Sequence, residues 1–326
     1  MNRATLQVIS QDEIGPSSPI ILDKEKRPTP GLETEERLRQ IALGLGRFSR
    51  VSFLSAEVAD EQLDATLGAV HAREYLDFLS HWSKNLELGQ IHLDEEHRAP
   101  GVDADTPIVA GAYGAAREAA RSAIAAAQEV TNGKLYSYAL CRPPGHHAGH
   151  NWLGGYCYLN NAVVAVRTLL NAGMSRVGVI DFDYHFGNGS ASLLERVSEV
   201  FYGSIHSSTE ISFPYMKTQP PNSRQVYVPF RDLPEPAEFL RGITRLLEES
   251  LAFGSEAMVV SVGYDIVADD PHGTWSLPPS VLQEVGRQLA ITSVPLCCVQ
   301  EGGYLLSKLE ECAYQFSLGL LGESDD

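Results

Sequence analysis

A run of apolar residues that leads directly into acidic and imidazole side chains constrains the fold of this chain more than any other feature. Residues 177–189 read VGVIDFDYHFGNG. An uninterrupted apolar run of this kind is typical of a strand that is buried on both faces of a parallel sheet. The polar residues then stand at the carboxyl end of the strand, where open α/β sheets bind their ligands.

Asp183 and His185 lie two positions apart in this stretch. Residues two apart on an extended chain point the same way, so the two side chains can converge on one metal ion. The alternative is a charged loop after a strand, in which Asp183 caps the following helix.

Predicted strands and helices alternate along the chain. The strands cover residues 51–55, 135–141, 176–182, 200–206, 226–230, 257–262 and 294–300. The helices cover residues 33–45, 60–67, 72–82, 111–128, 159–172, 189–197, 235–253, 279–291 and 304–321, and the alanine-rich helix at 111–128 follows a helix-start signal at 105–107. This alternation predicts a parallel sheet with helices on both faces.

Two segments stand outside the alternation. Residues 1–31 are polar and rich in Pro and Ser, and we expect a surface segment or a loop at the mouth of the site. Residues 83–104 form a long loop, and long loops in compact domains are often functional. The length of 326 residues suits one large α/β domain. We place that domain at residues 31–322, after an N-terminal segment of residues 1–30.

The charge balance excludes some classes of partner. The chain has 25 Lys and Arg against 42 Asp and Glu, which gives a net charge of −17. This balance disfavours nucleic acid and anionic membranes as partners and is compatible with a cationic substrate. No stretch approaches the length of a membrane-spanning helix, and we find no secretory signal at the N-terminus.

The five cysteines show neither the spacing of a zinc ribbon nor a disulfide framework. Most of them lie in or beside apolar runs, so we expect reduced core residues. A cytoplasmic location is therefore the expectation.

A second polar cluster follows the predicted strand at 135–141. Residues 142–147 read RPPGHH, and the prolines and the glycine make a rigid turn that presents His146 and His147 together. A lone histidine is usually structural, whereas an adjacent pair after a buried strand fits a functional role and a structural role equally well. Both interpretations are open at this point.

Two more clusters follow the strands at 257–262 and 294–300. Asp265 is the carboxylate nearest the end of its strand, so we prefer it as a ligand and expect Asp269 and Asp270 to brace the loop. Tyr304 follows two glycines and can turn its hydroxyl toward a developing oxyanion. A tyrosine at a helix start is, however, more often a packing residue.

Two Asp and one His around a metal ion leave an open coordination position, which is the catalytic pattern for zinc. Zinc lowers the pKa of bound water to about 7 and polarises a carbonyl group. An adjacent imidazole can take the proton and return it to the leaving group. Asp181 and Asn188 are available to fix the tautomers of His146 and His147.

With these clusters in this order, the chain resembles the histone deacetylase and acetylpolyamine amidohydrolase family. The resemblance runs from residue 30 to the C-terminus, and Asn188 makes it closer to the bacterial and class II branch. The matching motifs are HAREYLDFL (71–79), DADTP (103–107), RPPGHHA (142–148), GGYCYLNNA (154–162), DFDYHFGNG (181–189), GYDIVADDPHG (263–273) and EGGY (301–304). So many motifs in the same order are highly specific.

The resemblance implies an arginase-like or deacetylase-like single α/β domain, with a parallel sheet of about eight strands between helices. It also implies one catalytic zinc ion held by Asp183, His185 and Asp265. A structural potassium ion is expected as well, and its ligands would come from Asp181, Asp183, His185 and Ser204.

The resemblance assigns roles to the remaining polar residues. His146 and His147 match the tandem histidines of the family, with His147 as general base, and Asp181 and Asn188 match their partners. Tyr304 matches the tyrosine that stabilises the developing oxyanion.

The walls of the substrate tunnel follow from the same resemblance. Gly155 and Tyr156 match one wall of the narrow acyl-lysine tunnel. Phe213, in the stretch ISFPY, matches the facing wall.

Four departures from the family pattern bear on packing and on substrate choice. Phe186 and Val267 each stand where the family usually has a histidine, and His272 replaces an apolar residue. The early His-Pro-Glu element of the family is absent, and residues 27–38 (RPTPGLETEERL) take its place. Because none of these positions is an expected ligand or base, we expect the chemistry to be kept.

The sequence thus predicts a zinc-dependent amidohydrolase, a deacetylase that removes an acetyl or short acyl group from an acylated amine. An acetylpolyamine, an acetyl-lysine side chain and a small biosynthetic intermediate all fit. The net charge and the acidic residues 94–96 favour a cationic small molecule. By analogy with relatives that take small substrates, we also expect a homodimer in which residues 83–104 narrow the mouth.

Two alternatives are kept beside this interpretation. One is a non-catalytic relative that binds acyl-lysine or metal. The other is a two-manganese ureohydrolase on the same fold, which needs a denser set of Asp and His than Phe186 and Gly187 provide.

Overall fold

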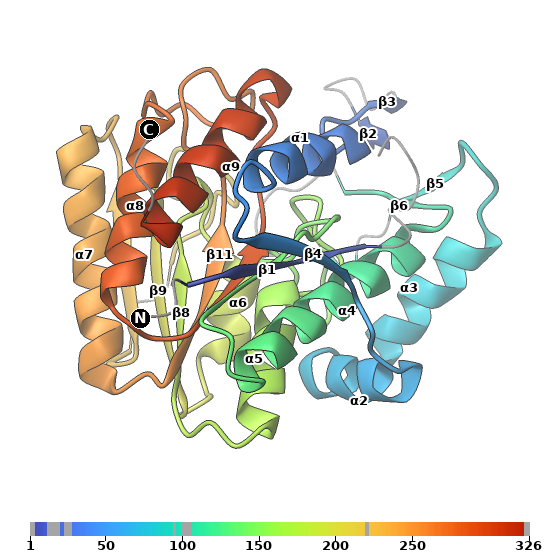
Figure 1. Cartoon of the computed structure of the whole chain (residues 1–326). Helices are drawn as coiled ribbons and strands as arrows, with labels where there is room; N and C mark the ends of the chain where they lie inside the picture. The colour runs from blue at the N-terminus through green and yellow to red at the C-terminus, as the bar shows by residue number, and fades with distance from the viewer. Residues whose placement is uncertain are drawn as a thin grey trace.

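The centre of the molecule is a sheet of eight strands in which all neighbouring strands are parallel (Figure 1). The computed structural model describes residues 4–11, 20–22, 28–93, 96–98, 106–218 and 222–322. In spatial order the strands are β10 (Gln225–Phe230), β9 (Val200–Ser207), β8 (Val177–Asp181), β11 (Ala257–Val262), β12 (Leu296–Gln300), β7 (Tyr136–Ala139), β1 (Leu6–Ser10) and β4 (Val51–Ser55).

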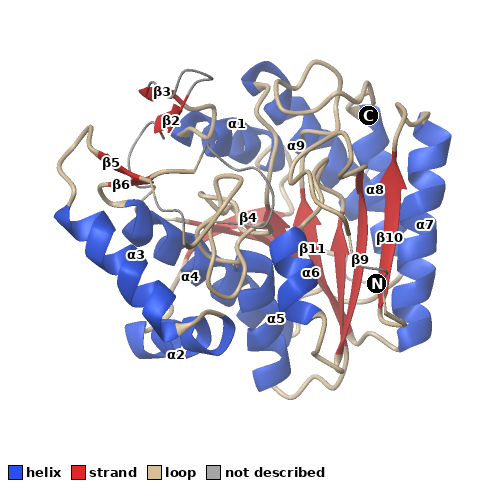
Figure 2. Ribbon diagram, turned by 180° about the vertical axis from the view of Figure 1, so that it is seen from behind, coloured by secondary structure: helices blue, strands red, loops and turns tan. Residues whose placement is uncertain are grey.

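Helices cover both faces of this sheet, and each face has its own hydrophobic core (Figures 1 and 2). One core is shared with α1 (Glu35–Leu45), α7 (Pro236–Phe253), α8 (Ser280–Ile291) and α9 (Leu306–Leu321). The other is shared with α2 (Asp60–Val70), α3 (Arg73–Asn85), α4 (Ala112–Thr131), α5 (Asn161–Asn171) and α6 (Asn188–Leu194). The predicted α/β architecture is therefore confirmed.

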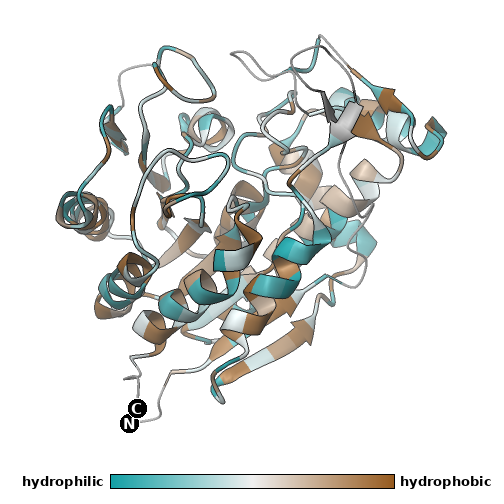
Figure 3. Ribbon diagram, turned by 90° about the horizontal axis from the view of Figure 1, so that it is seen from above, coloured by the Kyte–Doolittle hydropathy of each residue, from teal (hydrophilic) through white to brown (hydrophobic). Residues whose placement is uncertain are grey.

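Hydropathy explains why the elements form these layers. The central strands β8, β11 and β12 are buried along their whole length, as expected for strands covered on both faces. The helices present one hydrophobic and one hydrophilic side, which is visible from above (Figure 3). In α4 most of the buried side chains are alanines, which lets this helix lie close to its neighbours.

The N-terminal segment corrects one prediction. We expected residues 1–31 to lie on the surface, but Leu6–Ser10 form β1 inside the sheet, between β7 and β4. Leu6, Val8 and Ile9 are at most 1% exposed. The stretch is too short and too polar in its flanks to be distinguished from a loop by its pattern. The small antiparallel pair β2 (Ile20–Leu22) and β3 (Pro28–Pro30) also falls in this segment.

The predicted helix start at 105–107 is also wrong. Ile108–Val109 instead form β6, which pairs with β5 (Ile91–His92), and α4 begins after Gly111. Residues 94–95 and 99–105, which contain part of the acidic loop and of the DADTP motif, lie outside the described residues. Among the described residues, no helix combines the length and the apolar character needed to cross a bilayer.

The topology decides where the polar clusters meet. The strands that precede them are β7, β8, β11 and β12, and these are consecutive in the sheet as β8-β11-β12-β7. Because the strands are parallel, their carboxyl ends lie at one edge, and the four clusters converge there.

Candidate active site

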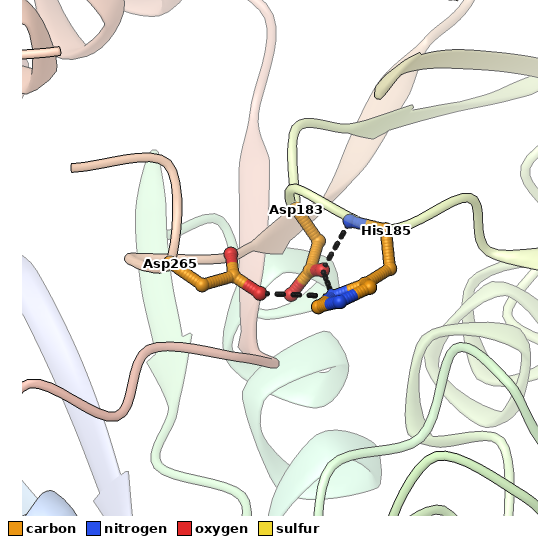
Figure 4. A group of neighbouring side chains, drawn as sticks. All are labelled: Asp183, His185 and Asp265. Atoms are coloured by element: carbon orange, nitrogen blue, oxygen red, sulfur yellow. Dashed lines mark hydrogen bonds and ion pairs between the residues drawn. The ribbon is translucent and has the colours of Figure 1, made fainter. Parts of the chain in front are cut away.

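Asp183, His185 and Asp265 lie together at this edge (Figure 4). One ligand atom from each lies within 4.8 Å of the others. Nδ1 of His185 is 3.2 Å from Oδ1 of Asp183 and 3.1 Å from Oδ2 of Asp265. The prediction that Asp183 and His185 point the same way is thus fulfilled, and the neighbouring strand β11 brings Asp265 to them.

Two glycines make room for these carboxylates. A Cβ atom at Gly302 would lie 2.5 Å from Oδ2 of both Asp183 and Asp265, and a Cβ at Gly263 would lie 2.5 Å from Cα of Asp183. The backbone N–H of Gly302 also donates to Oδ2 of Asp183 over 2.8 Å. Any side chain at these two positions would push the carboxylates apart.

The donor set suits a divalent metal ion. Asp183 and Asp265 are fully buried, and two carboxylates with one imidazole form a site that leaves a fourth position open. Burial, and then the neighbouring Asp183, raises the pKa of Asp265 to about 7. Burial alone would lower the pKa of His185, but its contacts with the two carboxylates raise it to about 10. The three residues therefore fit a cation that neutralises the carboxylates.

The two adjacent histidines have different partners. His146 and His147 are each 3% exposed, and their ring centres are 4.0 Å apart. Nδ1 of His146 lies 3.2 Å from Oδ2 of Asp181, whereas Nδ1 of His147 lies 2.8 Å from Oδ1 of Asn188. Since an amide oxygen only accepts, we assign the Nδ1 proton to His147, which leaves its Nε2 unprotonated.

The two rings also differ in pKa. Burial, and then the neighbouring His146, holds the pKa of His147 well below its usual range. Burial also acts to lower the pKa of His146, but the carboxylates of Asp183 and Asp181 raise it to about 10. His147 is therefore the ring that is neutral near pH 7.

Glu301 fixes the turn that carries the histidine pair, a role that the sequence did not reveal. Its Oε2 accepts from the backbone N–H of Gly145 over 2.7 Å and from that of His146 over 3.1 Å. Oγ of Ser261 donates to its Oε1 over 3.2 Å. In the sequence, Glu301 is only an acid that precedes two glycines, and nothing there indicates that its side chain reaches the turn at Gly145 and His146.

Tyr304 is 7% exposed and lines a cavity that Asp183, His185 and the histidine pair also line. Its backbone N–H donates to Oδ2 of Asp270 over 2.6 Å, so Asp270 braces the loop as predicted. Burial raises the pKa of the Tyr304 hydroxyl well above its usual range, so the hydroxyl stays protonated and able to donate.

Arg37 is a second residue that the sequence did not identify. Its side chain is fully buried, and its guanidinium lies 4.5 Å from the centre of the Tyr304 ring. It donates to the carbonyl oxygens of Gly303 and Glu301, each over 2.6 Å, and pairs with Glu33 over 2.9 Å. Because Glu33 and Arg37 are four apart in a helical pattern, they look in the sequence like an exposed ion pair.

The cavity above the metal donors has a volume of about 350 Å³ and contains all three predicted wall residues. The ring of Phe213 is perpendicular to that of His147, with 4.7 Å between centres. A Cβ at Gly155 would lie 2.3 Å from Cδ2 of His147, so only glycine fits at this point of the wall. The backbone N–H of Tyr156 donates to Oγ1 of Thr106 over 2.9 Å.

His272 also lines this cavity. Its Nε2 lies 3.0 Å from the hydroxyl of Tyr156, and its ring is perpendicular to that of Tyr304, with 4.6 Å between centres. Burial lowers the pKa of His272 to about 4, so this ring is neutral near pH 7. The substitution noted in the sequence thus places an imidazole between two tyrosines of the site.

Two further departures, Phe186 and Val267, do not line this cavity. Phe186 is buried, and its ring packs on His206 and Tyr227, with centres 4.6 and 4.9 Å apart. Val267 is buried in the core below α8 and α9. Oγ of Ser204 lies 2.9 Å from Nδ1 of His206, and the expected potassium ion stays a prediction.

A parallel sheet that holds two carboxylates, an imidazole, a histidine pair and a tyrosine at its carboxyl edge is typical of α/β metallohydrolases. Comparison with known proteins gives the family. The family profile described as "Histone deacetylase domain" matches residues 32–320. The chain therefore belongs to the histone deacetylase and acetylpolyamine amidohydrolase family.

Individual relatives agree with this result. Acetylpolyamine amidohydrolase from Mycoplana ramosa is 36% identical over 209 residues, which cover 62% of this chain and 61% of that protein. Acetylpolyamine amidohydrolase from Burkholderia pseudomallei is 32% identical over 278 residues, which cover 77% of this chain and 81% of that protein. The match thus spans less than two thirds of the first relative and most of the second.

A solved structure supports the fold over almost the whole chain. The crystal structure of acetylpolyamine aminohydrolase from Burkholderia pseudomallei superposes with a TM-score of 0.83 at 28% identity. The superposition covers 97% of this chain and 98% of that one.

Proposed function

We propose that this protein is a zinc-dependent amidohydrolase that removes an acetyl group from a small cationic amine, such as an acetylated polyamine. The observation that carries the proposal is that Asp183 and His185, which converge with Asp265, line one cavity together with the histidine pair and Tyr304. The names of the acetylpolyamine amidohydrolases that the chain resembles support this substrate class.

Asp183, His185 and Asp265 would hold the metal ion. When bound, zinc supplies Lewis acidity, which polarises an amide carbonyl and makes water easier to deprotonate near neutral pH. Phe213 and Tyr156 line the same cavity as Asp183 and His185, so they form part of the wall that a substrate at these donors would contact.

His147 acts as general base and then as general acid. Asn188 holds Nδ1 in its protonated form, so Nε2 takes the proton from the attacking water. The same Nε2 then gives this proton to the amine nitrogen as the C–N bond breaks. The products of this step are the neutral amine and acetic acid, and the acid then loses its proton to the amine or to solvent to give acetate.

Tyr304 supports the charge that develops on the carbonyl oxygen. Its protonated hydroxyl donates a hydrogen bond to that oxygen, and single donors of this kind contribute about 3–4 kcal/mol to transition-state stabilisation. Arg37, which packs on the ring and binds the carbonyl of Gly303, holds the tyrosine in position.

The substrate preference follows from charge. The net charge of −17 attracts cations, and His272, which contacts Tyr156 and Tyr304 in the cavity wall, adds no positive charge near pH 7. We therefore expect the free ammonium groups of a polyamine to stay at the acidic surface, while the acetylated end enters the cavity.

The proposal is tested by measuring metal content together with turnover of acetylputrescine, acetylspermidine and a fluorogenic acetyl-lysine peptide. One zinc per chain with faster turnover of the acetylated polyamines supports it. Zinc with faster turnover of the peptide would keep the chemistry and reject the substrate class. If the protein bound no zinc and turned over none of these substrates, the proposal that it is an enzyme would be rejected.

A further inference from the structure

A second cavity lies behind the histidine pair, and we call it the rear cavity. Its volume is about 180 Å³, and apolar walls are formed by Trp152, Phe186, Met216 and Tyr227. Among the described residues, none that lines the rear cavity also lines the cavity that holds the metal donors. The two cavities are therefore distinct binding spaces.

Two residues that line the rear cavity are hydrogen-bonded to His147, the general base of the proposed mechanism. Trp152 donates from Nε1 to the carbonyl oxygen of His147 over 3.1 Å. Asn188, another lining residue, accepts a hydrogen bond at Oδ1 from Nδ1 of His147 over 2.8 Å. Phe186 directly follows His185 in the chain. A molecule in the rear cavity thus contacts two residues that are hydrogen-bonded to His147 and one that follows His185 in the chain.

Asn188 offers an unused hydrogen-bond donor. The residue is 4% exposed, and its amide nitrogen Nδ2 has no hydrogen-bond partner among the described residues. The other buried amide of the lining is satisfied, because Gln225 donates to the carbonyl of Ala191 and accepts from the hydroxyl of Tyr227. Buried donors of this kind are normally paired, so an acceptor is expected next to Asn188.

Size and polarity define the ligand that fits. An apolar cavity of about 150 Å³ binds benzene, so about 180 Å³ accommodates one aromatic ring with a small substituent. The aromatic walls favour a flat ring. An anion is disfavoured, because the exposed Glu195 also lines the rear cavity and the chain is strongly acidic.

From these observations we infer that the rear cavity is a regulatory site for a small neutral aromatic carbonyl compound. The ring packs against Trp152 and Phe186, and the carbonyl oxygen accepts a hydrogen bond from Nδ2 of Asn188. Since the opposite end of the same amide orients His147, occupation changes the turnover number rather than substrate binding.

Binding is tested first, because it does not depend on the proposed activity. The probe is 4-fluorobenzamide, followed by fluorine NMR on the metal-loaded full chain with and without acetohydroxamate, which occupies the metal cavity. Ser192 lines the rear cavity and is exposed, so Ser192→Trp fills the space without disturbing the core. Ser198→Trp is the matched control, because Ser198 is exposed and lies outside the lining.

We expect at least tenfold weaker binding to the Ser192→Trp variant than to the wild type, and equal binding to the Ser198→Trp variant and to the wild type with acetohydroxamate. Equal affinity for both tryptophan variants, displacement by acetohydroxamate, or no binding at millimolar concentrations would each overturn the inference. These outcomes are independent of whether the protein hydrolyses acetylated polyamines.

The regulatory effect is tested with the substrate that the wild type turns over. At saturating substrate, 4-fluorobenzamide should change kcat at least twofold in the wild type and in Ser198→Trp, and leave the kcat of Ser192→Trp unchanged. An effect confined to KM, or the same effect on kcat in all three proteins, would overturn the regulatory role.

Discussion

The guanidinium of Arg37 lies over Tyr304, 4.5 Å from its ring centre, and donates to the carbonyl oxygens on either side of Gly302. One buried side chain from α1 thus fixes both the backbone beside the metal donors and the ring that faces the substrate. Cation–π contacts and charge-assisted hydrogen bonds of this kind are strong when they are removed from water.

Arg37→Lys should therefore lower both stability and activity, although it keeps the charge. Lysine cannot reproduce the planar fork that binds two carbonyl oxygens and Glu33. We expect a loss of about 3 kcal/mol in the free energy of unfolding, because each hydrogen bond from a charged group contributes about 1.5–3 kcal/mol. Arg39→Lys is the control, since Arg39 is exposed on the same helix. Equal stability of the two variants in urea unfolding would show that the buried contacts of Arg37 contribute little.

Tyr304→Phe should lower kcat by about 10²–10³-fold, which is the effect of removing one oxyanion donor. Its melting temperature should stay close to that of the wild type, because the contacts of Tyr304 in the structure come from its ring and its backbone N–H. Zinc content should also be unchanged. A tyrosine that only packs at the helix start would leave kcat within a few-fold, and that result would remove Tyr304 from the mechanism.

Asn188→Asp should shift the pH profile of kcat/KM to higher pH. In the wild type, burial and then His146 hold the pKa of His147 low, so the ring is neutral near pH 7. A carboxylate in place of the amide oxygen, 2.8 Å from Nδ1, favours the protonated ring and raises this pKa. The variant should lose more activity at pH 6 than at pH 9. A uniform loss at all pH values would show that His147 is not the titrating base. Asn132→Asp, at an exposed position, should match the wild type.

The sequence was informative where the positions of polar side chains follow from the alternation of side chains along an extended segment. Asp183 and His185 share one side of an extended segment, and this rule needs no knowledge of the fold. Asp265 could be chosen because it stands nearest the end of its strand. Position within the parallel sheet then brought it to the other two, since β8 and β11 are neighbours.

The sequence was silent where long-range contacts decide. Glu301 binds the turn before His146 from 155 residues away, and Arg37 reaches Gly303 across 266 residues. In its own segment Glu301 looks like a lone acid after a strand, and Arg37 looks like one half of an exposed ion pair on a helix. β1 was missed for a related reason, because a strand of five residues gains its burial from β4 and β7 rather than from its own pattern.

Metal removal should destabilise the protein, and Asp265→Asn should weaken the dependence of its stability on metal. In the folded chain burial and then Asp183 raise the pKa of Asp265 to about 7, so the carboxylates repel each other unless a cation lies between them. EDTA should lower the melting temperature and stoichiometric zinc should restore it. Asp265→Asn should melt below the zinc-loaded wild type but at or above the EDTA-treated wild type. Identical melting of the wild type with EDTA and with zinc would show that these residues hold no metal.

His272 and Tyr156 should act as one unit in substrate binding. Nε2 of His272 and the hydroxyl of Tyr156 are 3.0 Å apart at the cavity wall. His272→Leu and Tyr156→Phe should each raise KM for acetylated amines several-fold, because each frees the other side chain to move. The double variant should be no worse than either single one, with a coupling of about 0.5–3 kcal/mol. Strictly additive effects would mean that the two residues act separately.

His71 provides a test of stability against pH that is separate from the metal donors. The ring is 1% exposed, and burial lowers its pKa from 6.5 to about 4, while its Nδ1 bonds to the carbonyl oxygen of Gly149 over 2.8 Å and its Nε2 accepts from the backbone N–H of Asn160 over 3.0 Å. The neighbouring His150 also acts to lower the pKa. These contacts join the loop after the histidine pair to the start of α5.

Because the folded pKa lies below that of the unfolded chain, the unfolded state binds the proton more readily. The contribution of His71 is thus complete above pH 6.5 and is lost as the pH falls toward 4, by about 3 kcal/mol in total. His71→Gln keeps a donor and an acceptor but does not titrate. In urea unfolding with EDTA present, the wild type should lose about 3 kcal/mol more than this variant between pH 7.5 and pH 4. His81→Gln, at an exposed position, should follow the wild type, and parallel curves for all three proteins would show that His71 is not held neutral by burial.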